Sequence, residues 1–81
     1  MMINQEDYEK LIIYAIGKFE KMEHDGLIEY SGERLTDDGK KTFNELEDFG
    51  YQPPWPIFDM CVRKYKKEGK VKLKPNMASI Q

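Results

Sequence analysis

The chain has 81 residues, 40% of them apolar and 12% aromatic, which suffices for one small hydrophobic core but leaves little room for a large catalytic cleft. A single cysteine excludes an intrachain disulfide, and the longest apolar run, residues 11–16, is far shorter than the roughly 20 residues of a membrane-spanning helix. Because the N-terminus also lacks the layout of a signal peptide, we expect a soluble protein of the reducing cytoplasm that does not contact a membrane.

The formal net charge of -2 conceals a strong asymmetry along the chain. Residues 1–60 contain six Lys or Arg and fourteen Asp or Glu, whereas residues 61–81 contain seven and one. Such an asymmetry is typical of an interaction segment or of an element that faces nucleic acid. It is also explained if the two segments fold against each other and neutralise their charges, and the sequence leaves both interpretations open.

A helix with one apolar face is predicted to begin near Gln5 and to end at the segment HDG, residues 24–26. Asn4 is a suitable N-cap, and Gly26 can adopt the left-handed conformation that ends a helix. Seven apolar side chains fall within an arc of about 140° and are expected to face the core. They are Tyr8, Leu11, Ile12, Ala15, Ile16, Phe19 and Met22. Gly17 costs about 1 kcal/mol relative to Ala inside a helix, so we expect it to permit the close approach of another element.

Residues 27–50 are predicted to form a β-hairpin and a second helix. The segments LIEYS and RLT flank Gly32 at the spacing of a strand, a turn and a second strand. Thr36 is a suitable N-cap for the helix that follows, which carries Phe43, Leu46 and Phe49 on one side.

The last part of the chain is predicted to form a third helix and a short strand. Pro53 and Pro54 make the preceding connector rigid, and Pro56 suits the first position of the helix. The segment KVKLK then alternates as a half-buried strand does, with Val71 and Leu73 directed inward. The elements together predict the α+β class: one domain over residues 1–74, in the order helix, β-hairpin, helix, helix and short strand, with a flexible tail over residues 75–81. In this arrangement the final strand can join the hairpin as a third strand.

Residues 21–46, KMEHDGLIEYSGERLTDDGKKTFNEL, resemble the wing region of winged-helix regulators of the MarR and PadR type. In those proteins a recognition helix ends at Gly-Leu-Ile/Val, a hairpin wing follows, and Leu-Thr-x-x-Gly opens the next helix. The matching positions are Gly26, Leu27, Ile28, Leu35, Thr36 and Gly39. The resemblance implies a winged-helix-like fold in which Arg34, near the wing tip, would enter a minor groove of DNA. The alternative is that Arg34 is an ordinary solvated arginine of the hairpin.

The titratable residues form no recognisable catalytic or metal-binding pattern. Cys61 lies in the apolar arc of the third helix and is expected to be an inert core thiol, whereas His24 is expected to be exposed at a polar helix end. The spacings match neither a zinc site nor a phosphate-binding glycine motif. We therefore predict a protein that is not an enzyme and that requires no cofactor or metal.

Two surfaces are candidates for binding a partner, and the first is apolar and acidic. It consists of Ile13, Tyr14, Glu20, Glu23 and Trp55. Ile13 and Tyr14 fall outside the core-facing arc, which suggests contact with a partner or a homodimer through the first helix. Trp and Tyr are favoured as interface anchors because they bury a large area with few rotamers to lose. The alternative for Trp55 is that it folds back over the core.

The second candidate surface is basic and belongs to the third helix and the final strand. Its residues are Arg63, Lys64, Lys66, Lys67, Lys70, Lys72 and Lys74. Such a surface is suited to phosphates or to an acidic partner, and Arg34 would assist it in binding nucleic acid. The alternative is a solvated face that pairs with the acidic residues of the same chain.

These observations support two functional hypotheses. The first is a small non-enzymatic regulator or inhibitor that binds a protein partner, similar in size and charge to phage and mobile-element inhibitors such as anti-CRISPR-like proteins. That analogy is one of class and rests on no motif. The second is a winged-helix-like regulator that binds nucleic acid through the basic surface.

Overall fold

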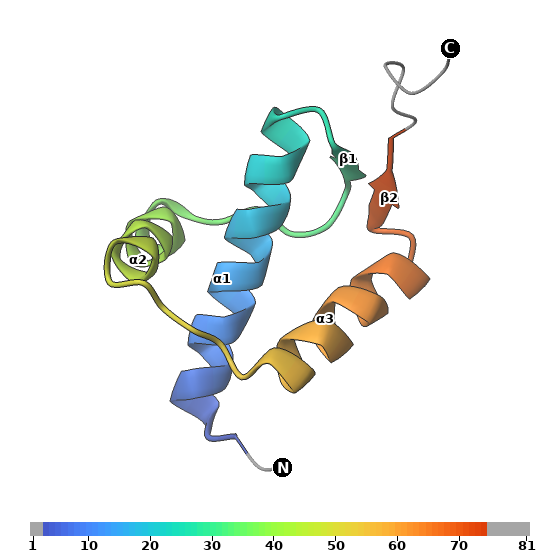
Figure 1. Cartoon of the computed structure of the whole chain (residues 1–81). Helices are drawn as coiled ribbons and strands as arrows, with labels where there is room; N and C mark the ends of the chain where they lie inside the picture. The colour runs from blue at the N-terminus through green and yellow to red at the C-terminus, as the bar shows by residue number, and fades with distance from the viewer. Residues whose placement is uncertain (1–2, 75–81) are drawn as a thin grey trace.

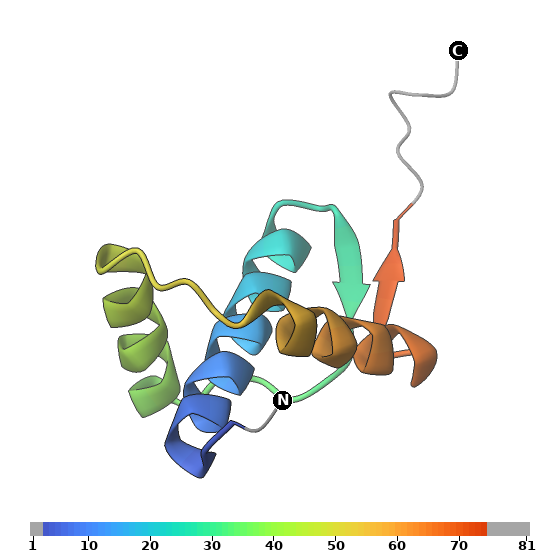
Figure 2. The same ribbon diagram turned by 60° about the horizontal axis from the view of Figure 1, so that its bottom comes forward.

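The long helix α1 (Gln5–His24) is the element around which the rest of the chain packs (Figure 1). The computed structural model describes residues 3–74, and the predicted tail lies outside the described residues. Helices α2 (Asp37–Asp48) and α3 (Trp55–Lys67) lie on opposite sides of α1 in both ribbon views (Figures 1 and 2). Strands β1 (Ile28–Tyr30) and β2 (Val71–Leu73) lie beside the C-terminal half of α1, which confirms the predicted α+β class.

The helix boundaries follow the capping residues that the sequence indicated. The Asn4 Oδ1 atom accepts the N–H of Asp7 at 2.8 Å, and the Thr36 Oγ1 atom accepts the N–H of Gly39 at 3.0 Å. Gly26 ends α1 with a φ of 78°, the left-handed conformation that glycine adopts without strain. Within the described residues, none of the helices combines the length and the apolar content needed to cross a membrane.

The sheet has two antiparallel strands, but the second one does not come from the predicted hairpin. In the observed register, Ile28 lies opposite Leu73, Glu29 opposite Lys72, and Tyr30 opposite Val71. Residues 34–36 (RLT), which were predicted to pair with residues 27–31 (LIEYS), form no strand, whereas the final strand does join the sheet. Local alternation cannot distinguish between partners, and a segment about forty residues away in the chain takes the place next to β1.

The main core gathers side chains from α1, both strands and α3. Its buried members are Leu11, Ala15, Ile16, Phe19, Ile28, Tyr30, Cys61, Tyr65 and Val71. On the other side of α1, Gly17 is buried against α2, and an added Cβ atom there would collide with the ring of Phe43. The predicted role of Gly17 in close packing is therefore confirmed.

Tyr14 was predicted to lie outside the core, and this prediction is wrong. Because α2 and α3 cover different sides of α1, the helix has a second buried face beyond the arc found in the sequence. Tyr14 is buried there, with ring centroids 5.9 Å from Phe43, 5.2 Å from Tyr51 and 5.9 Å from Phe58. This aromatic cluster joins α2, the connector and α3 to the middle of α1.

Three other side chains expected to face inward are exposed, among them Tyr8, which is 42% exposed near the N-terminal end of α1. Phe49 is 89% exposed because it follows the last turn of α2 as its C-cap residue, beyond the face that packs on α1. Leu73 is 74% exposed although it is directly opposite Ile28, which has no exposed surface. The outer strand therefore ends beyond the part of the core that α1 and α3 cover.

Candidate interaction surfaces

The structure does not assemble the predicted apolar and acidic surface. Tyr14 is part of the core, Ile13 is half-buried, and Trp55 is 52% exposed with its ring edge-on to Phe58 at 5.5 Å. Trp55 thus partly covers the core and partly faces solvent. Glu20 and Glu23 are occupied by contacts within the chain, so these five residues do not offer one continuous face.

Glu20 and Glu23 instead attach the segment after β1 to α1. The Glu20 carboxylate accepts the backbone N–H of Leu35 at 2.7 Å. The Arg34 guanidinium donates to both carboxylate oxygens of Glu23, with Nη2 to Oε2 at 2.9 Å, and to the carbonyl oxygen of Tyr30 at 2.8 Å. Its hydrogen bond to Arg34 holds the pKa of Glu23 below its ordinary value. Arg34 is therefore engaged in the fold instead of extending from a wing tip.

Glu33, which no sequence pattern singles out, accepts hydrogen bonds from two tyrosines next to this segment. The Tyr30 hydroxyl donates to the Glu33 carbonyl oxygen at 2.6 Å, and the Tyr65 hydroxyl donates to the Glu33 carboxylate at 3.3 Å. Burial raises the pKa of Tyr30 to about 12 and also raises the pKa of Tyr65. Both hydroxyls therefore act as neutral donors that fasten β1 and α3 to the same segment.

The reactive side chains take the positions that the sequence suggested. Cys61 is buried, and burial raises the pKa of its thiol, which disfavours the thiolate. His24 is exposed at the end of α1. No cluster of three or more His, Cys, Asp or Glu side chains suited to a metal ion occurs within residues 3–74.

The basic residues of α3, of β2 and of the positions next to β2 are exposed or partly exposed, and together we call them the cationic face. It consists of Arg63, Lys64, Lys66, Lys67, Lys70, Lys72 and Lys74. Two of them have local partners: Arg63 pairs with Asp59 at 2.9 Å, and Lys70 pairs with Glu68 at 3.2 Å. The remaining five lysines make no ion pair within the described part of the chain.

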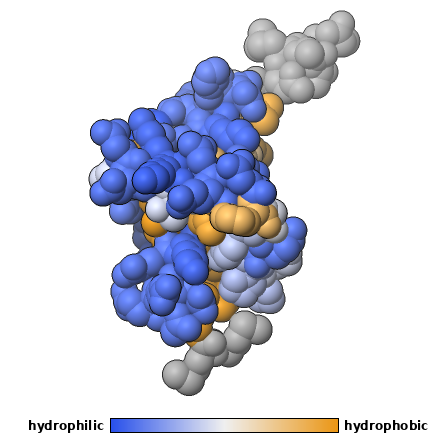
Figure 3. Space-filling view, turned by 90° about the vertical axis from the view of Figure 1, so that its left-hand side faces the viewer, coloured by the Kyte–Doolittle hydropathy of each residue, from blue (hydrophilic) through white to orange (hydrophobic). Residues whose placement is uncertain are grey.

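Away from this face, one carboxylate of α2 joins two lysines of α1. Glu47 on α2 accepts from Lys18 at 2.9 Å and from Lys21 at 3.1 Å, both on α1. The hydrogen bond from Lys18 is the main cause that holds the pKa of Glu47 below its ordinary value. The side of the molecule that carries α2 is mainly hydrophilic, with hydrophobic residues showing only in small separate areas (Figure 3). The described carboxylates of α1 and α2 therefore form no ion pair with the cationic face, although Lys74 lies near enough to Glu23 to help lower its pKa.

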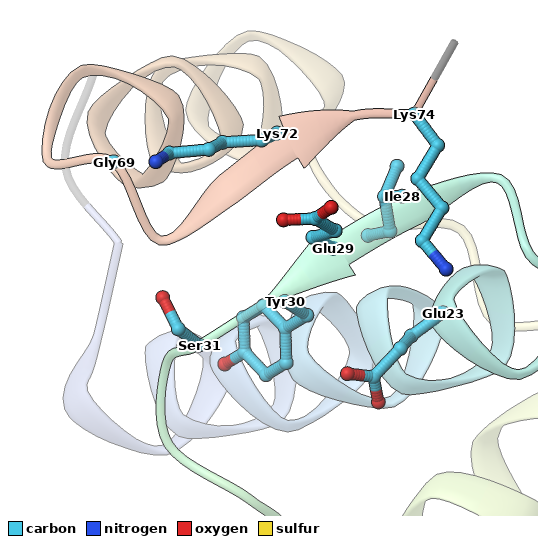
Figure 4. A pocket seen from close by; sticks show the side chains of 8 residues that line it. All are labelled: Glu23, Ile28, Glu29, Tyr30, Ser31, Gly69, Lys72 and Lys74. Carbon is cyan, nitrogen blue, oxygen red and sulfur yellow. The ribbon is translucent and has the colours of Figure 1, made fainter.

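A hollow of about 350 Å³ lies over the solvent side of the sheet, next to the cationic face (Figure 4). Its lining combines both signs of charge, with Glu23 and Glu29 on one part and Lys72 and Lys74 on the other. In the close-up, the Lys74 side chain extends toward Glu23, whereas Lys72 lies along its strand toward Gly69. The mixed lining suits polar groups of a protein better than a run of phosphates.

Comparison with family models, with curated proteins and with solved structures finds no match for this chain.

Proposed function

We propose that the chain is a small regulatory protein that acts without catalysis, by binding an acidic surface of a protein partner in the cytoplasm. The contact surface in this proposal is the cationic face. One observation carries it: five exposed or partly exposed lysines on one helix and one strand lack a carboxylate partner among residues 3–74, although the chain has more acidic than basic residues. Unpaired like charges gathered on one face disfavour the folded state on their own, and an acidic partner would relieve this repulsion.

The rest of the molecule favours a protein partner over nucleic acid. The sequence pI is about 5.4, whereas nucleic-acid-binding domains are usually basic overall, and the acidic residues of α1 and α2 would repel a long polyanion. Exposed apolar side chains also lie on α3, where Met60 is 68% exposed and precedes Lys64 by one helical turn. Met and Trp beside charged residues are typical of protein interfaces.

A chain of this size can regulate or inhibit a partner by occupying its surface. The similarity in size and charge to phage and mobile-element inhibitors supports this part of the proposal only by analogy of class.

A pair of charge reversals tests the proposal. Lys66→Glu with Lys67→Glu reverses two unpaired lysines of the cationic face, and Lys40→Glu with Lys41→Glu makes the same charge change on α2. Each variant serves as bait in a nuclease-treated lysate of the organism that encodes the chain. We expect the first variant to lose at least about tenfold of the recovered protein partner and the second to retain it. Equal recovery by both variants would overturn the proposal.

Nucleic acid is a second candidate because the exposed lysines follow one helix, as phosphate-binding residues often do. The structure leaves fewer residues for it than the sequence suggested, since Arg34, Arg63 and Lys70 are engaged by carboxylates. An electrophoretic shift of duplex DNA at low salt would support this candidate if the Lys66 and Lys67 reversal abolishes it. Its salt slope should then fall by about 1 for each phosphate contact removed.

A further inference from the structure

The hydrogen bonds at the ends of the sheet reveal which backbone groups face outward. Ser31 donates its N–H to the Lys70 carbonyl oxygen at 2.8 Å, and Lys74 donates its N–H to the Leu27 carbonyl oxygen at 3.2 Å. Along an antiparallel pair of strands, one pair of opposed residues exchanges two backbone hydrogen bonds and the next pair exchanges none. Because the pairs Ser31–Lys70 and Leu27–Lys74 are hydrogen-bonded and lie two positions away on either side, Glu29 and Lys72 also form a hydrogen-bonded pair. Val71 and Leu73 consequently direct their N–H and C=O groups away from β1.

The outer edge of β2 carries these groups without a partner in the described structure. Figures 1 and 2 show no described helix or strand beyond β2 on this side, and no backbone bond of Val71 N–H or Leu73 N–H appears among residues 3–74. The corresponding edge of β1 differs because Arg34 donates to the Tyr30 carbonyl oxygen. An unpaired strand edge is a template on which another extended chain can add.

We propose that an extended acidic segment of the protein partner adds to the outer edge of β2 as a third strand. This inference rests on the proposed function and specifies how the partner binds. The incoming strand would pair with the backbone of Val71 and Leu73. Its acidic side chains would lie beside Lys72 and Lys74 on the solvent side of the sheet. Its alternate side chains would cover Leu73, which is exposed on the other side.

The charge of Lys72 favours an acidic strand of a partner over a second copy of this chain at the edge of β2. A twofold antiparallel pairing of β2 with itself that uses both Val71 and Leu73 would be centred on Lys72. Two Lys72 side chains would then be directly opposed, and like charges in this position are destabilising. Lysine along an edge is a common way to prevent strands from pairing indiscriminately. The same charges are complementary to a strand that alternates acidic and apolar residues.

The test uses the full chain and a short acetylated peptide in which Glu and Val alternate, with a peptide of alternating Lys and Val as its control. Amide exchange and chemical shifts are followed by NMR on the labelled chain. We expect the acidic peptide to slow exchange at the Val71 and Leu73 amides by at least about tenfold, with little change at Glu29 and Lys72, whose amides already face each other. The basic peptide should have no effect.

Two substitutions separate backbone pairing from simple charge attraction. Leu73→Pro removes the outward N–H without removing a bond to β1, and Leu73→Ala removes the exposed side chain while keeping that N–H. We expect Leu73→Pro to abolish peptide binding and Leu73→Ala to retain most of it. Lys72→Glu, an exposed change that leaves the backbone intact, should weaken binding at least about tenfold and keep the inference testable if Leu73→Pro does not fold.

The outcomes distinguish the inference from the proposed function. Shifts confined to Lys64, Lys66 and Lys67, with no protection at Val71 and Leu73, would overturn strand addition and leave the cationic face as the binding surface. Protection of both amides without peptide, together with a dimer in sedimentation, would overturn the acidic occupant in favour of a second copy. The function itself would be overturned if the acidic peptide does not bind and if the Lys66 and Lys67 reversal recovers as much partner from the lysate as the Lys40 and Lys41 reversal.

Discussion

The two edges of the sheet differ although the strands are equally short and lie side by side. The edge of β1 faces the segment that follows it in the chain. There Arg34 donates hydrogen bonds to the Tyr30 carbonyl oxygen and to the Glu23 carboxylate, and the Glu20 carboxylate accepts the N–H of Leu35. The edge of β2 has lysines on its solvent side and no described partner for its outward backbone groups. The contrast shows that side chains satisfy outward backbone groups of β1, whereas those of β2 have no described partner.

The largest expected effect is a difference in stability between substitutions at Ile28 and Leu73, which lie opposite each other in the sheet. Ile28→Ala removes a fully buried side chain and should lower the free energy of unfolding by about 2–5 kcal/mol. Leu73→Ala at the opposed position should change it by less than about 0.5 kcal/mol, because that side chain is largely exposed. Urea denaturation of both variants measures the difference. Comparable losses would show that β2 is as well buried as β1.

A smaller effect is expected from removing the Arg34 hydrogen bonds at the edge of β1. Arg34→Ala removes the donors to Tyr30 and Glu23 and should lower the melting temperature and speed amide exchange in residues 31–35. Arg63→Ala is the matched control because Arg63 makes only a local pair with Asp59 on α3. The interpretation of Arg34 as a structural residue fails if the two variants melt alike.

The smallest expected effect is on the stability of the fold at acidic pH. The hydrogen bond from Lys18 lowers the pKa of Glu47 in the folded chain relative to its ordinary value near 4.5. A lowered folded pKa means that the stabilisation is complete above about pH 4.5 and is lost as the pH falls through the folded value. Glu47→Gln should therefore flatten the acid side of the stability profile, whereas Glu45→Gln, an exposed change on the same helix, should not. Thermal melts across the acidic range measure both slopes, and parallel profiles would count against this ion pair.

Much of the fold could be predicted because its helix signals are local. Asn4 and Thr36 act as N-caps through side-chain contacts within one turn, and Gly26 ends α1 by its own conformation. The strand pairing was predicted only in part. The sequence allowed the final strand to join the sheet, which is observed, but the pairing within residues 27–36 was wrong, since Arg34 and Leu35 alternate suitably but bind α1 through side chains.

The candidate surfaces were predictable to different degrees for the same reason. The cationic face lies on one helix and the adjoining strand, so spacing alone identified Lys64, Lys66 and Lys67 as exposed. The apolar and acidic surface required knowing that α2 and α3 cover two sides of α1, which buries Tyr14. The open edge of β2 became visible only from the register of the sheet.

Residue-resolved amide exchange of the free chain tests the difference between the two edges most directly. The amides of Ser31 and Lys74 donate to carbonyl oxygens across the sheet and should exchange slowly. The amides of Val71 and Leu73 point outward and should exchange at rates close to those of an unstructured peptide. Protection of Val71 and Leu73 equal to that of Ser31 and Lys74 would mean that the outer edge of β2 is already occupied, which would contradict the open edge on which the proposed binding mode depends.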